Sequence, residues 1–178
     1  MSAVHLLRLS GELARAGRRE VGGVLVGEHL GGERFALLDF SVQRRGGGRA
    51  HFRRDPVKAA AFVEAAIARH GGDPARVNYL GEWHSHPACP AVPSPVDVAQ
   101  MRDIVDDPDQ PGEFSVLLVV SLTPTTLQMS MTLFRRGVEE TEVTVELDGG
   151  PPIQVAFPGD GVEVRDGAQG DEEEHADA

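Results

Sequence analysis

The sequence has one cysteine, Cys89, and no apolar run long enough to cross a bilayer. A single cysteine excludes an intramolecular disulfide and is typical of proteins from a reducing compartment. The N-terminal residues lack the basic segment, the apolar core and the small-residue cleavage site of a secretory signal. We therefore expect a soluble, cytoplasmic protein without a membrane anchor.

Positive charge is also scarce, since the net charge is −11, and the excess of acids is unevenly placed. Residues 160–178 hold eight acids against one arginine, which gives −7 and leaves −4 for residues 1–159. The segment 160–178 has no aromatic residue and cannot repay the entropy of ordering, so we expect a disordered acidic tail. Residues 1–159 have the length of one compact domain, and this charge balance gives no support to nucleic-acid binding.

The hydrophobic pattern predicts a mixture of helices and strands within that domain. Helices are expected at 4–16, 56–70 and 95–106. Strands are expected at 21–26, 35–42, 77–86, 114–122, 125–134 and 138–147, with a turn at 28–33 and the last two strands paired as a hairpin. Because strands and helices do not alternate strictly, we expect an α+β fold or a three-layer α/β/α sandwich.

The parts of an open metal site lie between residues 82 and 97. His84 and His86 stand two residues apart at the end of an expected strand, so their imidazoles point to the same face. Asp97 follows a Pro-rich loop that can turn the chain back. Two histidines and one carboxylate suit a catalytic zinc with an open fourth position, whereas a structural zinc usually takes four protein ligands.

Each piece of this pattern also has an ordinary structural interpretation. A His-x-His pair on a strand is more often packed or exposed than metal-binding, unless other ligands converge on it. Ser94 and Asp97 fit the first turn of a helix, with Ser94 as its N-cap. The cap and the metal site are compatible, because the cap would turn Asp97 toward the histidines.

The spacing His-x-His, seven residues, Ser, two residues, Asp resembles the JAMM signature of the MPN+ (JAB) zinc metalloproteases. His84, His86, Ser94 and Asp97 match it at all four positions. Glu20 begins a Gly-rich apolar stretch, which is where that family places its catalytic glutamate. The resemblance covers roughly residues 18–135 and implies a curved mixed sheet flanked by helices. It further implies one Zn²⁺ per chain on His84, His86 and Asp97, Glu20 as general base, and Ser94 as a donor to the oxyanion.

The family cleaves isopeptide or peptide bonds that follow the Gly-Gly tail of a ubiquitin-like protein. The resemblance therefore implies a peptidase whose partners are a ubiquitin-like protein, its conjugates, or a target enzyme modified by E1- and E2-like enzymes. The segment 79–87 is similar to that of small stand-alone peptidases of bacterial antiphage operons, including those of the CBASS type.

Three other functions stay open on the sequence alone: a peptidase acting on a ubiquitin-like sulfur carrier in biosynthesis, a non-catalytic MPN interaction scaffold, and a DNA-associated RadC-like protein. The complete ligand set argues against the scaffold. The Ser-x-x-Asp half of the motif and the acidic tail argue against the RadC-like protein.

Two residues close to the motif, Glu82 and Cys89, could also take part in the site. Glu82 shares a strand face with the histidines, so spacing leaves it open as a ligand or base; the resemblance favours Glu20 and leaves Glu82 a solvent-side or hydrogen-bonding role. Cys89 lies in the loop between the ligands, where we expect a small packed thiol rather than a replacement ligand.

Residues 44–54 carry five arginines around three glycines. We expect this basic segment to line the approach of the substrate, the alternative being a solvated hairpin tip.

Overall fold

The computed structural model describes residues 1–44, 54–109 and 112–148. Most of the basic segment and the acidic tail lie outside the described residues, so both of those expectations stay predictions. The chain forms helices α1 (Ala3–Ala16), α2 (Pro56–Arg69) and α3 (Pro95–Asp106), and strands β1 (Gly22–Gly31), β2 (Arg34–Phe40), β3 (Val77–Ser85), β4 (Phe114–Leu122), β5 (Leu127–Arg135) and β6 (Val138–Glu142). None of the described helices has the length and apolar character needed to span a bilayer.

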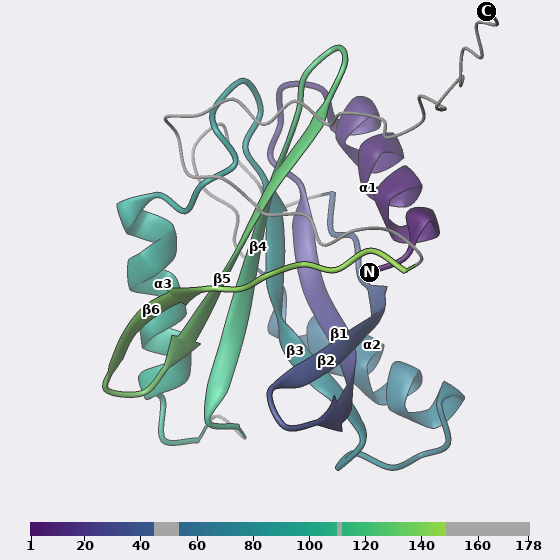
Figure 1. The fold of residues 1–178 in the computed structure, drawn as a ribbon, viewed down its shortest axis with the longest axis vertical. Coiled ribbons are helices and arrows are strands. Elements are labelled where there is room, and N and C mark those ends of the chain that lie inside the picture. The colour runs from purple at the N-terminus through teal and green to yellow at the C-terminus, as the bar shows by residue number, and fades with distance from the viewer. Residues whose placement is uncertain (45–53, 110–111, 149–178) are drawn as a thin grey trace, which may run out of the picture.

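The strands make one sheet in the order β2-β1-β3-β4-β5-β6, shown in Figure 1. Every neighbouring pair is antiparallel except β3 and β4, which are parallel. A parallel pair needs a crossover connection, and here the crossover contains α3. This mixed sheet with its flanking helices confirms the expected α+β fold.

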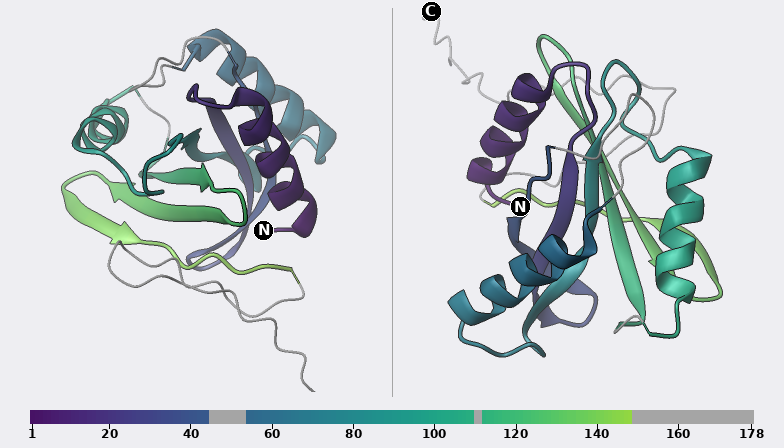
Figure 2. Two further views of the ribbon diagram at one scale, coloured as in Figure 1. Left: turned by 90° about the horizontal axis from the view of Figure 1, so that it is seen from above. Right: turned by 180° about the vertical axis from the view of Figure 1, so that it is seen from behind.

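Alternation along β4 separates the two faces of the sheet. Val116, Leu118 and Val120 pack in a core cluster with residues of α1, whereas Leu117 and Val119 pack with residues of α3. α2 contacts the α3 side of β1 and β3 through a smaller apolar cluster. Both views of Figure 2 show α2 and α3 lying apart across the sheet. On this face α2 therefore covers β1 and β3, and α3 covers β4 and β5.

Two expected strand boundaries are wrong by more than two residues. β1 continues through Gly31, so the turn is confined to the residues next to Gly32 instead of 28–33. Gly31 and Gly32 have φ values of 99° and 60°, the left-handed region that a tight turn requires. The last strand ends at Glu142 instead of 147. Just beyond it, the N–H of Val143 still donates to the Met131 carbonyl of β5 at 2.9 Å, and Val145 packs into the core on the α1 face.

Candidate metal centre

The two histidines lie at the end of β3, an inner strand between β1 and β4. His84 pairs with Gly22 of β1 and Val119 of β4, so its side chain lies on the face that α2 and α3 flank. His86 follows the strand, and its N–H donates to the Val120 carbonyl at 2.8 Å, which keeps it in the direction of the sheet. The two Nε2 atoms lie 3.0 Å apart, so the expected common face is confirmed.

Asp97 reaches the histidines because of the way α3 begins. Ser94 is the N-cap of this helix, and the N–H of Asp97 donates to its Oγ at 3.3 Å. In return the N–H of Ser94 donates to Asp97 Oδ2 at 2.7 Å. This reciprocal capping box confirms the predicted cap. It holds the carboxylate 3.3 Å from the Nε2 atom of each histidine.

One ligand atom from each of the three residues lies within 4.8 Å of the others, close enough for the three to share one ion. Zinc ligands about 2.0–2.1 Å from the metal lie about 3.3–3.4 Å from one another in a tetrahedron. The two Nε2 atoms are 3.0 Å apart, and a different Asp97 oxygen lies 3.3 Å from each of them, Oδ1 from His84 and Oδ2 from His86. His86 Nδ1 is 3.2 Å from the Pro90 carbonyl, which can only accept, so Nδ1 carries the proton and leaves Nε2 for a metal. Across the described residues, this trio is the group of His, Cys, Asp and Glu side chains placed to hold an ion.

The electrostatics of the trio also favour a cation. Burial alone would raise the pKa of Asp97, but hydrogen bonds from His84 and His86 outweigh burial and hold this pKa well below its usual value. The hydrogen bond to Asp97 raises the pKa of His86, with smaller contributions from the Pro90 carbonyl and the charge of Glu20, while burial opposes them. The negative field that stabilises a proton here would equally stabilise a metal ion.

Glu20 is a buried acid at the start of the neighbouring strand. The N–H of Val21 donates to Ser85 Oγ at 3.0 Å, and the N–H of Ser85 donates to the Val21 carbonyl at 2.8 Å. This pairing continues the β1–β3 register and places Glu20 across from His86, on the face of the metal trio. Glu20 is thus a carboxylate beside the trio and not a member of it. Sequence analysis missed the role of Ser85, because its side chain points away from the histidines.

Glu82 lies on the same face, as alternation predicted, but its side chain is only 14% exposed and has a cationic partner. Its Oε1 is 3.0 Å from Arg54 Nε, although the angle between them is not that of a hydrogen bond. Burial raises the pKa of Glu82, against the opposing charges of Arg54 and His84. The expected solvent-side role is therefore wrong. No sequence signal singled out Arg54 from the other arginines of the basic segment.

Cys89 is exposed, so the expectation of a packed thiol is also wrong. It lies outside the His84, His86 and Asp97 group, in agreement with the expectation that Asp97 and not a thiolate completes the trio.

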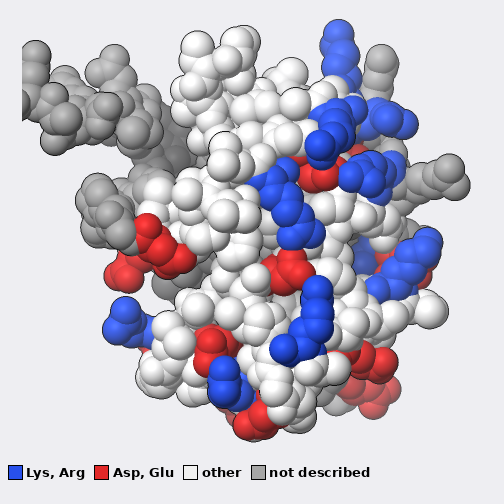
Figure 3. Space-filling model, turned by 90° about the vertical axis from the view of Figure 1, so that its right-hand side faces the viewer, with Lys and Arg blue, Asp and Glu red and all other residues white. Residues whose placement is uncertain are grey.

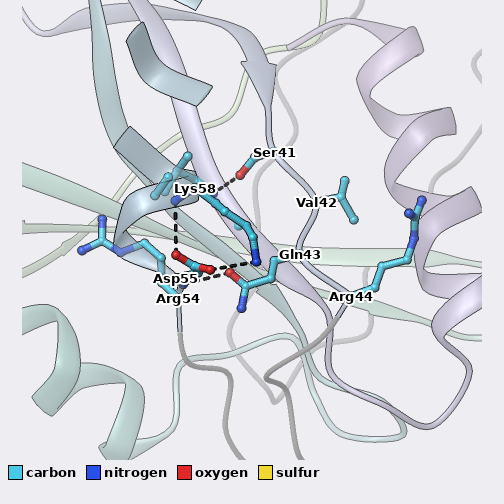
Figure 4. A pocket seen from close by; sticks show the side chains of 10 residues that line it. Ser41, Val42, Gln43, Arg44, Arg54, Asp55 and Lys58 are labelled. Carbon is cyan, nitrogen blue, oxygen red and sulfur yellow. Dashed lines mark hydrogen bonds and ion pairs between the residues drawn. The ribbon is translucent and has the colours of Figure 1, made fainter. Parts of the chain in front are cut away.

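A cavity of about 230 Å³ lies across β1 from the trio. Gln43 pairs with Gly22, the residue opposite His84, and accepts the N–H of Asp55 at the start of α2. Figure 4 shows Ser41, Gln43, Asp55 and Lys58 around this hollow. The hollow therefore lies between the first residues of β1 and those of α2.

The family model of prokaryotic homologs of the JAB domain matches residues 2–136, well over half of the 178 residues. The chain belongs to this family. Among curated proteins, none matches the sequence. In this JAB domain the matched region contains Glu20, the whole trio and the capping residue Ser94. The domain thus has a His-His-Asp group able to hold a metal ion, on the fold that the sequence motif implied.

Proposed function

We propose that this JAB domain is a zinc-dependent isopeptidase or peptidase that cleaves after the C-terminal tail of a ubiquitin-like protein. The observation that carries the proposal is the triangle of His84, His86 and Asp97 with a buried carboxylate, Glu20, beside it. Three ligands leave a fourth position open on the face between α2 and α3, and an open position distinguishes catalytic from structural zinc sites.

A zinc ion in this site supplies Lewis-acid activation of water and of the scissile carbonyl. Glu20 accepts the proton of the attacking water and delivers it to the leaving amine, first as general base and then as general acid. Ser94 Oγ already accepts the N–H of Asp97, so its own O–H remains available to donate to the oxyanion. No covalent intermediate is required, and the exposed Cys89 has no part in the reaction.

We propose that an extended substrate tail binds in the cavity beside β1. Small residues line part of it, and a Cβ on Gly23 would come within 2.3 Å of the Ser41 carbonyl. That close approach holds residues 41–44 against β1, and the Trp83 indole N–H reinforces it with a hydrogen bond to the same carbonyl at 2.8 Å. The wall of the cavity is therefore fixed to β3, the strand that carries the histidines.

The proposal is tested with fusions of ubiquitin-like proteins from the same genome, each joined after its terminal glycines to a reporter through a peptide bond or a lysine isopeptide bond. The zinc-loaded protein should cleave at least one fusion directly after the tail, and the Glu20→Ala variant should not. Failure of the wild type on every fusion would leave a non-catalytic scaffold as the better interpretation.

The biological setting is proposed from residues 79–87 alone, whose similarity points to bacterial antiphage operons. Neighbouring genes for E1- and E2-like enzymes would support a deconjugating role. Neighbouring genes for cysteine or cofactor synthesis would instead assign the protein to a sulfur-carrier pathway.

A further inference from the structure

The described part of the chain separates its charges. Residues 1–44 and 54–69 carry 9 Lys and Arg against 7 Asp and Glu, a balance of +2. Residues 70–109 and 112–148 carry 4 against 13, a balance of −9. Charge divided in this way between two parts of one domain produces a field that orients approaching charged partners.

Six cations of the first part gather at the end of the sheet where the metal trio lies. We call them the basic rim: Arg15, Arg18, Arg19, Arg44, Arg54 and Lys58. Gly17 is the C-cap of α1, and Arg18 and Arg19 lie between this cap and Glu20. Arg44 follows Gln43, which pairs with Gly22 opposite His84, and Lys58 lies in the first turn of α2. In Figure 3, which shows the side bearing α1 and α2, blue side chains gather in the upper right part with little red between them.

Acids hold part of the rim in place without neutralising it. Glu12, buried in α1, binds Arg44 through two hydrogen bonds of 2.9 and 2.8 Å and also pairs with Arg15 at 2.8 Å. Glu82 fixes Arg54, and Asp55 pairs with Lys58 at 2.8 Å. Six cations against these three acids leave +3. Fixed guanidinium groups lose little entropy when they bind an anion.

Because Arg44, Arg54 and Lys58 also line the cavity proposed for the tail, we infer that the basic rim binds an acidic surface that the ubiquitin-like protein carries next to its scissile tail. The inference rests on the proposed function for the identity of the partner, but not for the existence of the binding surface. A nucleic acid fits less well, because duplex binding engages about 6–10 phosphates and the rim offers +3 beside a part of the molecule that carries −9.

Binding is measured by fluorescence anisotropy at low salt, with a labelled 20-residue peptide of alternating Glu and Gly that ends in Gly-Gly. The rim variant is Arg18→Gln, Arg19→Gln, Lys58→Gln. The control variant, Arg34→Gln, Arg76→Gln, Arg135→Gln, removes the same charge from the opposite end of the sheet, where these side chains are exposed. The Kd should rise roughly fivefold or more in the rim variant and stay near the wild-type value in the control, and salt should reduce the difference.

Equal affinity in the rim and control variants would overturn the inference. So would tighter binding of a 20-nucleotide single-stranded DNA than of the peptide. A further variant carries Asn and Gln in place of the acids of 160–178. Stronger peptide binding by this variant than by the wild type would also overturn the inference, because the rim would then bind the chain's own tail. Cleavage of fusions separates the rim from the proposed peptidase function. In a fusion that is cleaved, neutralising the acids beside the tail of the ubiquitin-like protein should lower kcat/KM. If no fusion is cleaved, the proposed function fails, while the peptide experiment still decides the rim.

Discussion

Removing the imidazole pair gives the most direct test of the metal centre. The double variant His84→Ala, His86→Ala removes two of the three ligand residues and leaves Asp97 as a single carboxylate. Wild-type protein should carry about one zinc per chain, and free zinc at 100 times its Kd should stabilise the fold by about 2.7 kcal/mol. At about 2–4 °C per kcal/mol for a protein of this size, Tm should rise by roughly 5–10 °C. The double variant should bind no zinc and show no rise.

Metal analysis of the purified proteins and thermal unfolding with zinc or a chelator measure both quantities. His29→Ala, His70→Ala is the matched control, because it also removes two imidazoles but neither belongs to the trio. The control should keep its zinc and its zinc-dependent Tm. Equal zinc content in the trio variant and the wild type would refute the site, whatever the unfolding curves show.

The remaining predictions concern the base, the helix cap and an ion pair far from the site. Glu20→Ala should retain zinc but lose roughly 100-fold or more of the hydrolysis rate, and Glu82→Ala should lose far less; the reverse order would move the base to β3. Ser94→Ala should lower Tm by about 2–4 °C, because losing an N-cap costs about 1 kcal/mol, and Ser94→Thr should recover most of that loss; equal Tm in all three proteins would contradict the cap. Burial alone would raise the pKa of Asp39, but contacts with Arg8 and Arg69 lower it below its usual value. Its ion pairs therefore stabilise the protein above about pH 4 and lose their effect as pH falls through the lowered pKa. Urea unfolding should show Asp39→Asn less stable than wild type at pH 7, with a smaller difference below about pH 4; a difference that does not change with pH would count against this reasoning.

Helix boundaries were predictable because their signals are local. Asp55 and Ser94 both cap a helix whose first residue is proline, and the structure begins α2 and α3 at those prolines. The strand register was not predictable, because it depends on contacts distant in sequence. The β1–β3 pairing shifts between Leu25 and Val26, and at Gly81 a Cβ would come within 1.9 Å of the Val116 carbonyl. Only the assembled sheet explains why glycine is needed there.

In the candidate site too, local patterns were predictable and contacts between distant segments were not. His84, His86 and Asp97 lie within fourteen residues, and strand alternation with a helix cap suffices to bring them together. Glu20 belongs to another strand, so its position came from family resemblance, and only the β1–β3 register places it across from His86. The pairing of Glu82 with Arg54 depends on how the segment before α2 packs, and no spacing rule could find it.

Three buried or nearly buried carboxylates lie on one face: Glu20, Glu82 and Asp97. Their burial lowers the stability of the folded state. Asp97 is stabilised by the N-terminus of α3 and by two imidazoles, and Glu82 by Arg54. Apolar residues at the same positions would make a more stable core, so stability alone does not account for this cluster. Its acids collect negative potential where the three ligand atoms converge, and a divalent cation there would offset much of their mutual repulsion. The cluster is therefore better explained by the proposed metal site and the proposed reaction than by folding.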